Sequence, residues 1–389
     1  FPKKTPCEPD VSHPSMAVNL DACIQCNLCV RACREVQVND VIGMAYRGEN
    51  SKIVFDFDDP MGESTCVACG ECVQACPTGA LMPASVVDEK GIGHTDIDNK
   101  VESVCPYCGV GCQIEYNVKD NKIKYVNGLD GPANKNRLCV KGRFGFDYVS
   151  NPERLTKPLI RINGKPKDLH PNINFSNIHE YFREASWEEA LDFASEGLKK
   201  IKSNKNDKSN LAGFGSAKCS NEEAYLFQKL IRTGLETNNV DHCTRLCHAS
   251  SVAALLETIG SGAVTAPFYE VEHSEVIIVI GANPTENHPV AATFFKNAAK
   301  RGKKLIVMDP RGHALKQHSS HMIQFKPGSD VALLNSMMNV IIEEKLFNSD
   351  YIKEHTAGFD ELKDHLRNFS PEKMESRTGI KPDTIREIA

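Results

Sequence analysis

Cysteine spacing is the feature that most limits what this chain can fold into. Thirteen of its sixteen cysteines lie before residue 150, and two runs of four share the spacing C-x2-C-x2-C-x3-C. The runs are CIQCNLCVRAC, which begins at residue 23, and CVACGECVQAC, which begins at residue 66. Structural disulfides are common in small secreted domains, but they do not explain a strict repeated spacing in a chain with a large apolar remainder. The pattern predicts thiolate ligands for iron–sulfur clusters.

The spacing resembles that of two-cluster bacterial ferredoxins, in which the fourth cysteine of each run binds the cluster of the other run. Pro77 follows the second run as in that family, whereas Arg34 follows the first. The resemblance implies two 4Fe-4S clusters, one held by Cys23, Cys26, Cys29 and Cys76, and the other by Cys66, Cys69, Cys72 and Cys33.

Zinc is the alternative, because paired C-x2-C motifs also mark zinc sites. A zinc site takes four ligands in two pairs, whereas each run here has three close cysteines and a fourth. We therefore interpret the repeat as an internal duplication that binds two clusters.

A third group of cysteines has a different spacing. Cys105, Cys108 and Cys112 stand at C-x2-C-x3-C, and Cys139 follows at a distance. The flanking segment GCQIEYNVKDNKIKYVNGLDG alternates apolar and polar residues around Asn-Gly and Asp-Gly pairs, which predicts short antiparallel strands and hairpins. We expect a small β-rich domain that holds one more cluster.

Helix and strand patterns alternate after residue 151. Capping boxes at Ser186 and Ser220 predict two helices. The apolar run 275–281 predicts a strand buried on both faces, followed by a helix over 288–302, strands over 303–311 and 321–326, and a helix over 329–347. This order favours a doubly wound α/β sheet, whose ligands bind beyond the carboxyl ends of the strands.

The segments CPYCGVGC, NRLCVKGRFG and NPERLTKPLIR resemble the amino-terminal cluster domain of the molybdenum or tungsten bis(pyranopterin guanine dinucleotide) oxidoreductases. This resemblance covers nearly the whole chain from about Cys105. It implies that Lys141 lies between the third cluster and a pterin, where a cation would favour electron arrival. A solvated surface lysine is the alternative.

The same resemblance implies guanine dinucleotide contacts in three loops that follow the predicted strands. These contacts would come from Asn283, Glu286, Asn287, Asp309, Arg311, Gly328 and Asp330. Each of these residues alone could instead serve only to form a turn. The G-x-G-x-x-G fingerprint is missing from these loops, so we do not expect the chain to bind NAD itself.

The segment NNVDHCTRLCHASSV contains Cys247 followed directly by His248. The C-x3-C-H pattern is a weak signal by itself, and buried core cysteines are the ordinary interpretation. The pair resembles the metal ligand and following histidine of formate dehydrogenases in this family. The resemblance implies that Cys247 binds Mo or W and that His248 acts in catalysis. Cys243 lies outside the match, and Cys7, His13 and Cys219 have no predicted role.

The predicted fold class has three parts: an α+β ferredoxin-like two-cluster module, a small β-rich 4Fe-4S domain, and an α/β doubly wound, Rossmann-like molybdopterin oxidoreductase core that is truncated. The expected boundaries are an unassigned segment 1–15, the ferredoxin-type domain 16–95, the 4Fe-4S domain 98–154 and the α/β domain 155–389. The chain opens at Phe1 and stops inside a predicted helix. We expect it to be a piece of a longer protein that also supplies an arginine for the formate carboxylate.

These observations together predict the catalytic subunit of a formate dehydrogenase, with formate or CO2 as substrate and Mo or W bis(molybdopterin guanine dinucleotide) and three 4Fe-4S clusters as cofactors. A net charge of −5 gives no reason to expect nucleic acid, and no apolar run is long enough to cross a bilayer. The resemblance to cytoplasmic formate dehydrogenases implies a cytoplasmic protein. It also implies an electron-acceptor subunit that binds flavin and NAD, or a ferredoxin.

Two rival functions remain open at this point. An assimilatory nitrate reductase-like molybdoenzyme also uses a cysteine ligand, although the adjacent Cys247 and His248 argue against it. A non-catalytic iron–sulfur subunit of an NADH dehydrogenase-like complex would share the ferredoxin-like clusters. Such a subunit needs neither the thiolate ligand nor the dinucleotide loops.

Overall fold

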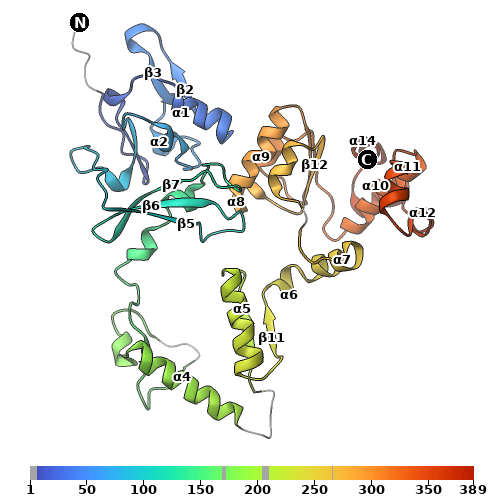
Figure 1. Cartoon of the computed structure of the whole chain (residues 1–389). Coiled ribbons are helices and arrows are strands. Elements are labelled where there is room, and N and C mark those ends of the chain that lie inside the picture. The colour runs from blue at the N-terminus through green and yellow to red at the C-terminus, as the bar shows by residue number, and fades with distance from the viewer. Residues whose placement is uncertain (1–6, 169–171, 204–209, 265) are drawn as a thin grey trace. The chain divides into compact units, whose positions relative to one another are not determined.

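The computed structural model describes residues 7–168, 172–203, 210–264 and 266–389 (Figure 1). The chain forms two units, one made of Phe1–Phe144 with Ala266–Ala389 and the other of Gly145–Thr265. The predicted α/β domain, 155–389, is therefore divided between the two units. The predicted domain boundaries stay predictions.

The duplicated cysteine runs form two similar halves at the start of the first unit. Its elements are β1 (Met16–Val18), α1 (Leu28–Arg31), β2 (Ile42–Ala45), β3 (Lys52–Phe55), α2 (Glu71–Ala75) and β4 (Leu81–Pro83). Antiparallel pairing joins β1 to β4 and β2 to β3. Buried apolar residues from all four strands pack with the cysteines in one core.

The backbone repeats its conformation in the two cysteine runs. Positive φ angles flank the second cysteine of each run. They occur at Gln25 and Asn27 (57° and 62°) and at Ala68 and Gly70 (54° and 67°). Left-handed conformations are uncommon outside glycine, so their recurrence at matching positions is specific. The internal duplication is thus present in the backbone as well as in the sequence.

A three-stranded antiparallel sheet follows, made of β5 (Asn99–Val104), β6 (Gln113–Lys119) and β7 (Lys122–Gly128), and then α3 (Val140–Phe144). Hairpins were expected here, but the predicted turn residues were wrong. The β6–β7 turn uses Asp120 and Asn121, both with positive φ, whereas the pair Asn127–Gly128 belongs to β7. Asn and Asp tolerate the left-handed region, which explains why this turn needs no glycine.

The rest of the first unit contains a parallel sheet in the order β12 (Val276–Ile280), β13 (Lys304–Met308) and β14 (His321–Ile323). The predicted order of strands and helices is present, with one addition: the loop 281–289 contains the short helix α8 (Pro284–Asn287) before α9 (Pro289–Lys300). In the described residues the strand order runs in sequence, so double winding stays a prediction.

The expectation that the strand over 275–281 is buried on both faces was wrong. Ile277 and Val279 are buried against Ala298 and Leu305, whereas Val276 and Ile278 are 53% and 47% exposed. An apolar run cannot by itself distinguish a strand covered on both sides from one covered on a single side.

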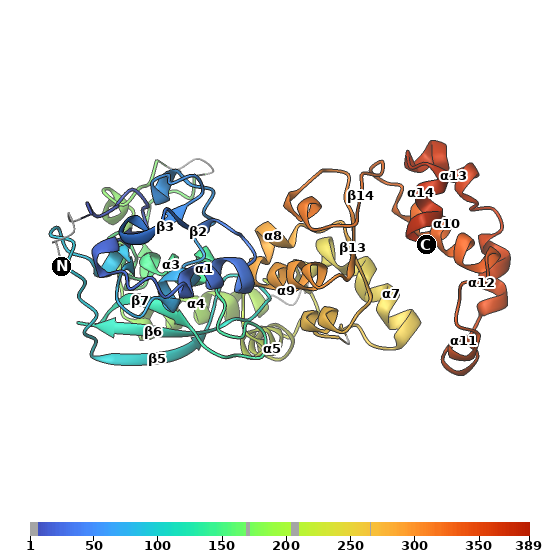
Figure 2. The same cartoon turned by 90° about the horizontal axis from the view of Figure 1, so that it is seen from above.

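Five helices complete this unit (Figure 2), namely α10 (Asp330–Glu343), α11 (Ser349–His355), α12 (Phe359–Leu366), α13 (Pro371–Thr378) and α14 (Pro382–Ile388). Apolar residues of α10 and α14 form one core with β13 and β14. Lys381 is the N-cap of α14, and Asp383 lies in its first turn.

The second unit contains the antiparallel pair β8 (Leu159–Arg161) and β9 (Phe182–Glu184), and the parallel pair β10 (Gly213–Gly215) and β11 (Val240–His242). Its helices are α4 (Trp187–Lys202), α5 (Asn221–Lys229), α6 (Thr244–Cys247) and α7 (Ala249–Ile259).

Helix capping in this unit differs in part from the prediction. Ser220 and Glu223 form a full capping box, whereas Ser186 caps α4 without the return bond from Glu189. The Glu189 carboxylate instead accepts a hydrogen bond from Arg183. In β10, Phe214 is 82% exposed.

None of the helices in the described ranges is long and apolar enough to serve as a transmembrane segment.

The core that α10 and α14 form with β13 and β14 generates a stability prediction. Leu333 is fully buried in that core, whereas its neighbour Leu334 is 38% exposed. We expect Leu333→Ala to lower the free energy of unfolding by about 2–5 kcal/mol, because it removes apolar contacts and leaves a cavity. Leu334→Ala is the matched control and should change it by about 0.5 kcal/mol or less. Denaturant unfolding followed by circular dichroism measures both, and equal losses would contradict the burial of Leu333.

Candidate iron–sulfur and cofactor sites

The first group of cysteines combines three residues of one run with one residue of the other. Cys23, Cys26, Cys29 and Cys76 line a small cavity together with Leu20, Ile24, Ile53 and Leu81. Burial raises the pKa of the Cys29 thiol to about 11, and the nearby Cys23 and Cys76 thiols add to this rise. Burial would also raise the pKa of Cys76, but backbone N–H groups of Thr78 and Leu81 outweigh it and lower that pKa. The fold thus brings together the four residues predicted for one cluster.

The second group is buried more deeply. Burial raises the pKa of the Cys69 thiol to about 12 and that of Cys72 well above its usual value, and the thiols of Cys66 and Cys33 add to both rises. These mutual interactions place the four residues predicted for the second cluster close together. The Val41 N–H donates to the Cys33 sulfur at 3.3 Å, which would stabilise its thiolate.

Equivalent N–H to sulfur contacts recur in the two runs. The Gln25 N–H donates to Cys23 Sγ at 3.4 Å, and the Ala68 N–H donates to Cys66 Sγ at the same distance. Both donor residues, Gln25 and Ala68, have the positive φ angles described above. Such contacts favour the thiolate over the thiol, as cluster ligation requires.

The third group lines a cavity of its own. Cys105, Cys108, Cys112 and Cys139 surround it with Lys141, Gly142, Asn287, Pro289 and Val290. Burial raises the pKa of Cys112 to about 12, and the three other thiols add to this rise. Residues of α8 and α9 therefore close a cavity whose cysteines come from the β-rich domain.

The arrangement of these thiols fits iron–sulfur clusters better than zinc. Within the described ranges, no three Cys, His, Asp or Glu side chains converge closely enough to hold a single metal ion. Two of the three cysteine groups each stand around a cavity, four cysteines to a group. Four thiols around a cavity are the donor set of a 4Fe-4S cluster.

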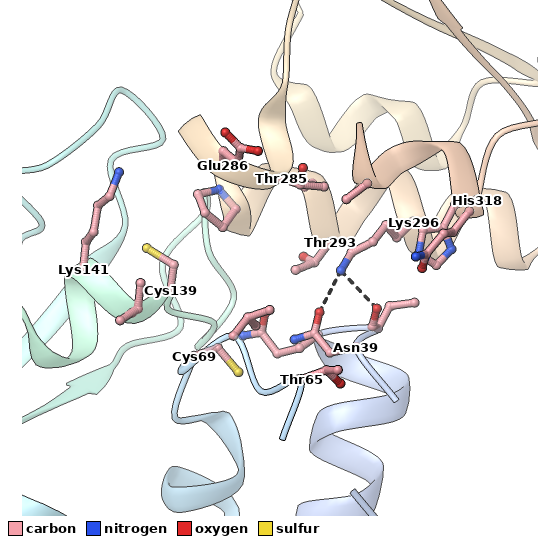
Figure 3. Close-up of a pocket in the computed structure, with 18 residues that line it drawn as sticks. Asn39, Thr65, Cys69, Cys139, Lys141, Thr285, Glu286, Thr293, Lys296 and His318 are labelled. Carbon is pink, nitrogen blue, oxygen red and sulfur yellow. Dashed lines mark hydrogen bonds between the residues drawn. The ribbon is translucent and has the colours of Figure 1, made fainter. Parts of the chain in front are cut away.

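A larger cavity of about 560 Å³ lies between the second and third groups and α9 (Figure 3). Cys69 and Cys139 line it from two different cysteine groups, and Lys141 and Glu286 lie beside Cys139. Lys141 therefore borders both this cavity and the cavity of the third group. Its position beside a cluster site agrees with the prediction, whereas its position beside a pterin stays a prediction.

Lys296 is a buried residue of this cavity that the sequence reasoning missed. Its ammonium donates to the Val38 carbonyl and to Asn39 Oδ1, both at 3.0 Å (Figure 3). Burial lowers the pKa of Lys296 to about 8, and the Cys69 and Cys33 thiols oppose this effect. The signal that could have found it was a lysine on the apolar face of the amphipathic helix predicted over 288–302.

The seven predicted dinucleotide contacts do not surround one common cavity. Glu286 lines the larger cavity, whereas Asn287 lines the cavity of the third cysteine group. Asn283 is buried at the start of α8, and its side chain accepts a hydrogen bond from Thr285. Asp309 follows β13 and accepts a bond from the Arg311 N–H. Gly328 has a φ of +78° and open space around it, and Asp330 begins α10.

Cys247 and His248 belong to the second unit. Cys247 is exposed at the end of α6, and His248 joins α6 to α7. The His248 N–H donates to the Thr244 carbonyl, and its own carbonyl accepts from Val252. Cys243 has a structural contact, since its sulfur accepts the Ala217 N–H at 3.3 Å. The junction fixes the backbone of Cys247 and His248 and leaves the thiol open to a ligand.

A second cavity was not predicted and lies at the ends of β10 and β11. Its polar lining includes Cys219, Glu223, Asp241 and His242. Cys219 donates to the Ser216 carbonyl at 3.0 Å. A position beyond the carboxyl ends of parallel strands was the signal that could have found this cavity.

Thiol-lined cavities in a ferredoxin-like module and in a β-rich domain, followed by an α/β part, indicate the class of iron–sulfur oxidoreductases. The chain belongs to the molybdopterin oxidoreductase family, whose pattern matches residues 154–364. The molybdopterin oxidoreductase Fe4S4 domain matches residues 98–151, and the 4Fe-4S dicluster domain matches residues 22–80. A ferredoxin-type 4Fe-4S domain followed by a molybdopterin oxidoreductase domain is thus confirmed.

Relatives match along almost the entire chain. "Probable oxidoreductase YjgC" of Bacillus subtilis is 34% identical over 99% of this chain and 41% of its own length. "Putative formate dehydrogenase SAB2186c" of Staphylococcus aureus is 34% identical over 97% of this chain and 40% of its own. The chain spans about two fifths of the length of these relatives.

A solved structure shares the fold. Acetylene hydratase from Pelobacter acetylenicus matches with a TM-score of 0.59 and 23% identity, over 74% of this chain and 38% of that one. At this identity the similarity concerns the fold alone.

The crossed grouping of the ferredoxin cysteines generates a test. We expect Cys76→Ser to remove the cluster of Cys23, Cys26 and Cys29, and Cys33→Ser to remove the cluster of Cys66, Cys69 and Cys72. Each variant should lose about a third of its iron and sulfide, since one of three clusters goes. Electron paramagnetic resonance identifies the missing signal, and loss of the opposite cluster in each variant would show that the runs do not cross.

The raised thiol pKa values generate a pH prediction. A thiol binds iron only as a thiolate, so a raised pKa in the empty site means that a proton must leave. Cluster occupancy should therefore rise from about pH 7 to about pH 9, tenfold in affinity per pH unit for each proton released. The second group, in which burial raises the pKa of Cys69 to about 12 and that of Cys72 well above its usual value, should fill at higher pH than the first.

Reconstitution with iron and sulfide, followed by electron paramagnetic resonance at each pH, measures this order. The first group is the internal control, because its Cys76 pKa is lowered. Assembly of both clusters at the same pH would contradict the prediction that deeper burial of the second group delays its filling.

Proposed function

We propose that this chain is part of the catalytic subunit of a formate dehydrogenase, which oxidises formate to CO2 or runs the reverse reaction. The observation that carries the proposal is the alignment of relatives named as formate dehydrogenases over 97% or more of this chain. The adjacent Cys247 and His248 support it within a family that binds molybdopterin. Oxidation of formate yields CO2, one proton and two electrons.

The finer cofactor assignment belongs to this proposal. Three 4Fe-4S clusters would be held by the three cysteine groups. A Mo or W bis(molybdopterin guanine dinucleotide) would bind at Asn283, Glu286, Asn287, Asp309, Arg311, Gly328 and Asp330, after the strands of a doubly wound sheet. When bound, this cofactor would supply the acceptor for the two electrons of formate.

Cys247 would serve as the protein ligand of the metal. A soft thiolate suits a sulfur-rich Mo or W site, and the exposed position of Cys247 leaves its sulfur free to bind. The imidazole of His248, the next residue, would orient formate and take up its proton. Lys141 would hold a positive charge next to the third cluster, which favours the arrival of an electron.

The acceptor would be a separate subunit, either linked to flavin and NAD or of the ferredoxin type, and the enzyme would work in the cytoplasm. The cysteine groups would divide a two-electron oxidation into single-electron transfers. Nitrate reduction is the alternative activity, and iron without Mo or W would indicate the non-catalytic alternative.

Two cysteines four residues apart offer a matched test of this proposal. In the complete, cofactor-loaded protein, Cys247→Ser should reduce formate oxidation by at least about a hundredfold, because a hydroxyl replaces the soft metal ligand. Cys243→Ser should retain most activity, since its oxygen can still accept the Ala217 N–H.

Formate-dependent dye reduction measures the activity, and metal analysis with electron paramagnetic resonance verifies that the clusters remain. Full turnover in Cys247→Ser, or nitrate reduction in place of formate oxidation, would refute the proposed function.

A further inference from the structure

Arg143 is the most deeply buried cation among the described residues of the first unit, and neither the predicted site nor the proposed mechanism uses it. Its side chain is 2% exposed. Nε donates to the Cys69 carbonyl at 2.9 Å, and the guanidinium also donates to Gln74 Oε1 at 2.6 Å and to the Val126 carbonyl at 3.3 Å. A terminal nitrogen contacts Glu71 Oε2 at 3.1 Å. Because arginine does not deprotonate in proteins, a permanent positive charge is fixed here.

This residue connects two cysteine groups directly. Its backbone N–H donates to the Cys139 carbonyl at 3.0 Å, and its side chain donates to the Cys69 carbonyl. Cys139 belongs to the third group and Cys69 to the second. Burial lowers the pKa of Arg143, while Glu71 and the thiols of Cys69, Cys72 and Cys139 oppose that shift. The positive charge therefore lies within electrostatic reach of both groups.

A second buried contact joins the same two groups. Gln37, which is 4% exposed, donates to Glu71 Oε2 at 3.3 Å and to the Leu138 carbonyl at 3.0 Å. Leu138 precedes Cys139, and Gln37 lies four residues after Cys33 of the second group. Gln37, Glu71 and Arg143 thus form one buried polar network between the second and third groups.

The backbone makes room for this network. A Cβ atom on Gly70 would lie 2.2 Å from Arg143 Cδ, and the φ of Gly70 is +67°. Only glycine meets both conditions without strain.

A purely mechanical role is the ordinary interpretation of a buried ion pair. Such pairs add little net stability compared with apolar packing of the same volume, because both charges lose their hydration. The network instead places a charge beside the ligands of one cluster and a hydrogen-bonded connection to the ligands of another. This placement favours a role in electron transfer.

We propose that Arg143 is a positioning residue that couples the third cluster to the second. It fixes the Cys139 and Cys69 loops against each other, and its charge makes the second cluster easier to reduce. With both clusters bound, one electron would pass from the reduced third cluster to the oxidised second cluster, and no bond or proton would change place. The inference rests on the proposed function, because it requires both clusters.

Two substitutions with opposite charge effects test the proposal. Arg143→Gln removes the cation and leaves Glu71 uncompensated, so the ratio of reduced to oxidised second cluster should fall about tenfold at a fixed potential, or about 59 mV for one electron. Glu71→Gln should raise the same ratio. The double variant should return to within about threefold of the original, because both charges are gone.

Redox titration of the anaerobically purified holoprotein, followed by electron paramagnetic resonance, gives this ratio without any activity assay. The magnetic interaction between the reduced second and third clusters is a second readout, and it should weaken in Arg143→Gln. Arg143→Lys, which keeps the charge, should assemble all clusters and titrate within about threefold of the original. Arg367→Gln, at an exposed arginine, is the control for charge alone.

Unchanged potentials and an unchanged magnetic interaction in Arg143→Gln would overturn the inference. A shift in the same direction in Arg143→Gln and Glu71→Gln would also overturn it, since that result indicates loosening of the interface. A tenfold shift in Arg143→Lys would refute the charge effect. A holoprotein that lacks the clusters altogether would instead contradict the proposed function.

Discussion

Burial of thiols is the constraint on which the first unit depends. Cys29, Cys33 and Cys72 belong to the same core as the apolar residues of β1 to β4, so the ferredoxin module packs around its own ligands. A buried thiol without metal holds its proton, as the raised pKa values of Cys29 and Cys72 indicate. Metal binding and folding are coupled in sites of this kind. The stability of the module would then come largely from the clusters.

The two cysteine-rich parts and the α/β part meet through polar contacts of cations, of which Lys296 and Arg143 are buried and Lys300 is exposed. Lys296 of α9 donates to the segment that follows the first cysteine run, and Lys300 adds contacts to the Arg34 carbonyl and to Asp40. Arg143 does the same between the ferredoxin module and the β-rich domain. Lys296 and Arg143 lie near thiols that would carry negative charge as cluster ligands. Their positions therefore agree with the sign of the charge that the sites are expected to hold.

The sequence predicted the parts whose signal is local. Cysteine spacing placed twelve residues in three groups, and the structure gathers each group, because a ligand loop is short and its spacing is set by the metal. Strand and helix patterns predicted the parallel strands around Val279 correctly, but not the exposure of Val276. The buried roles of Arg143 and Lys296 depend on partners 74 and 258 residues away, and no local pattern reports such contacts.

The duplicated cysteine runs have become unequal in one respect. Asn27 and Gly70 occupy matching left-handed positions, yet only Gly70 lies against a neighbouring domain. Asparagine can adopt this conformation at moderate cost, whereas at Gly70 any side chain would also displace Arg143. The freedom of the two halves to vary therefore differs: a side chain accepted at Asn27 in the first loop would, at Gly70 in the second, push the second and third cysteine groups apart.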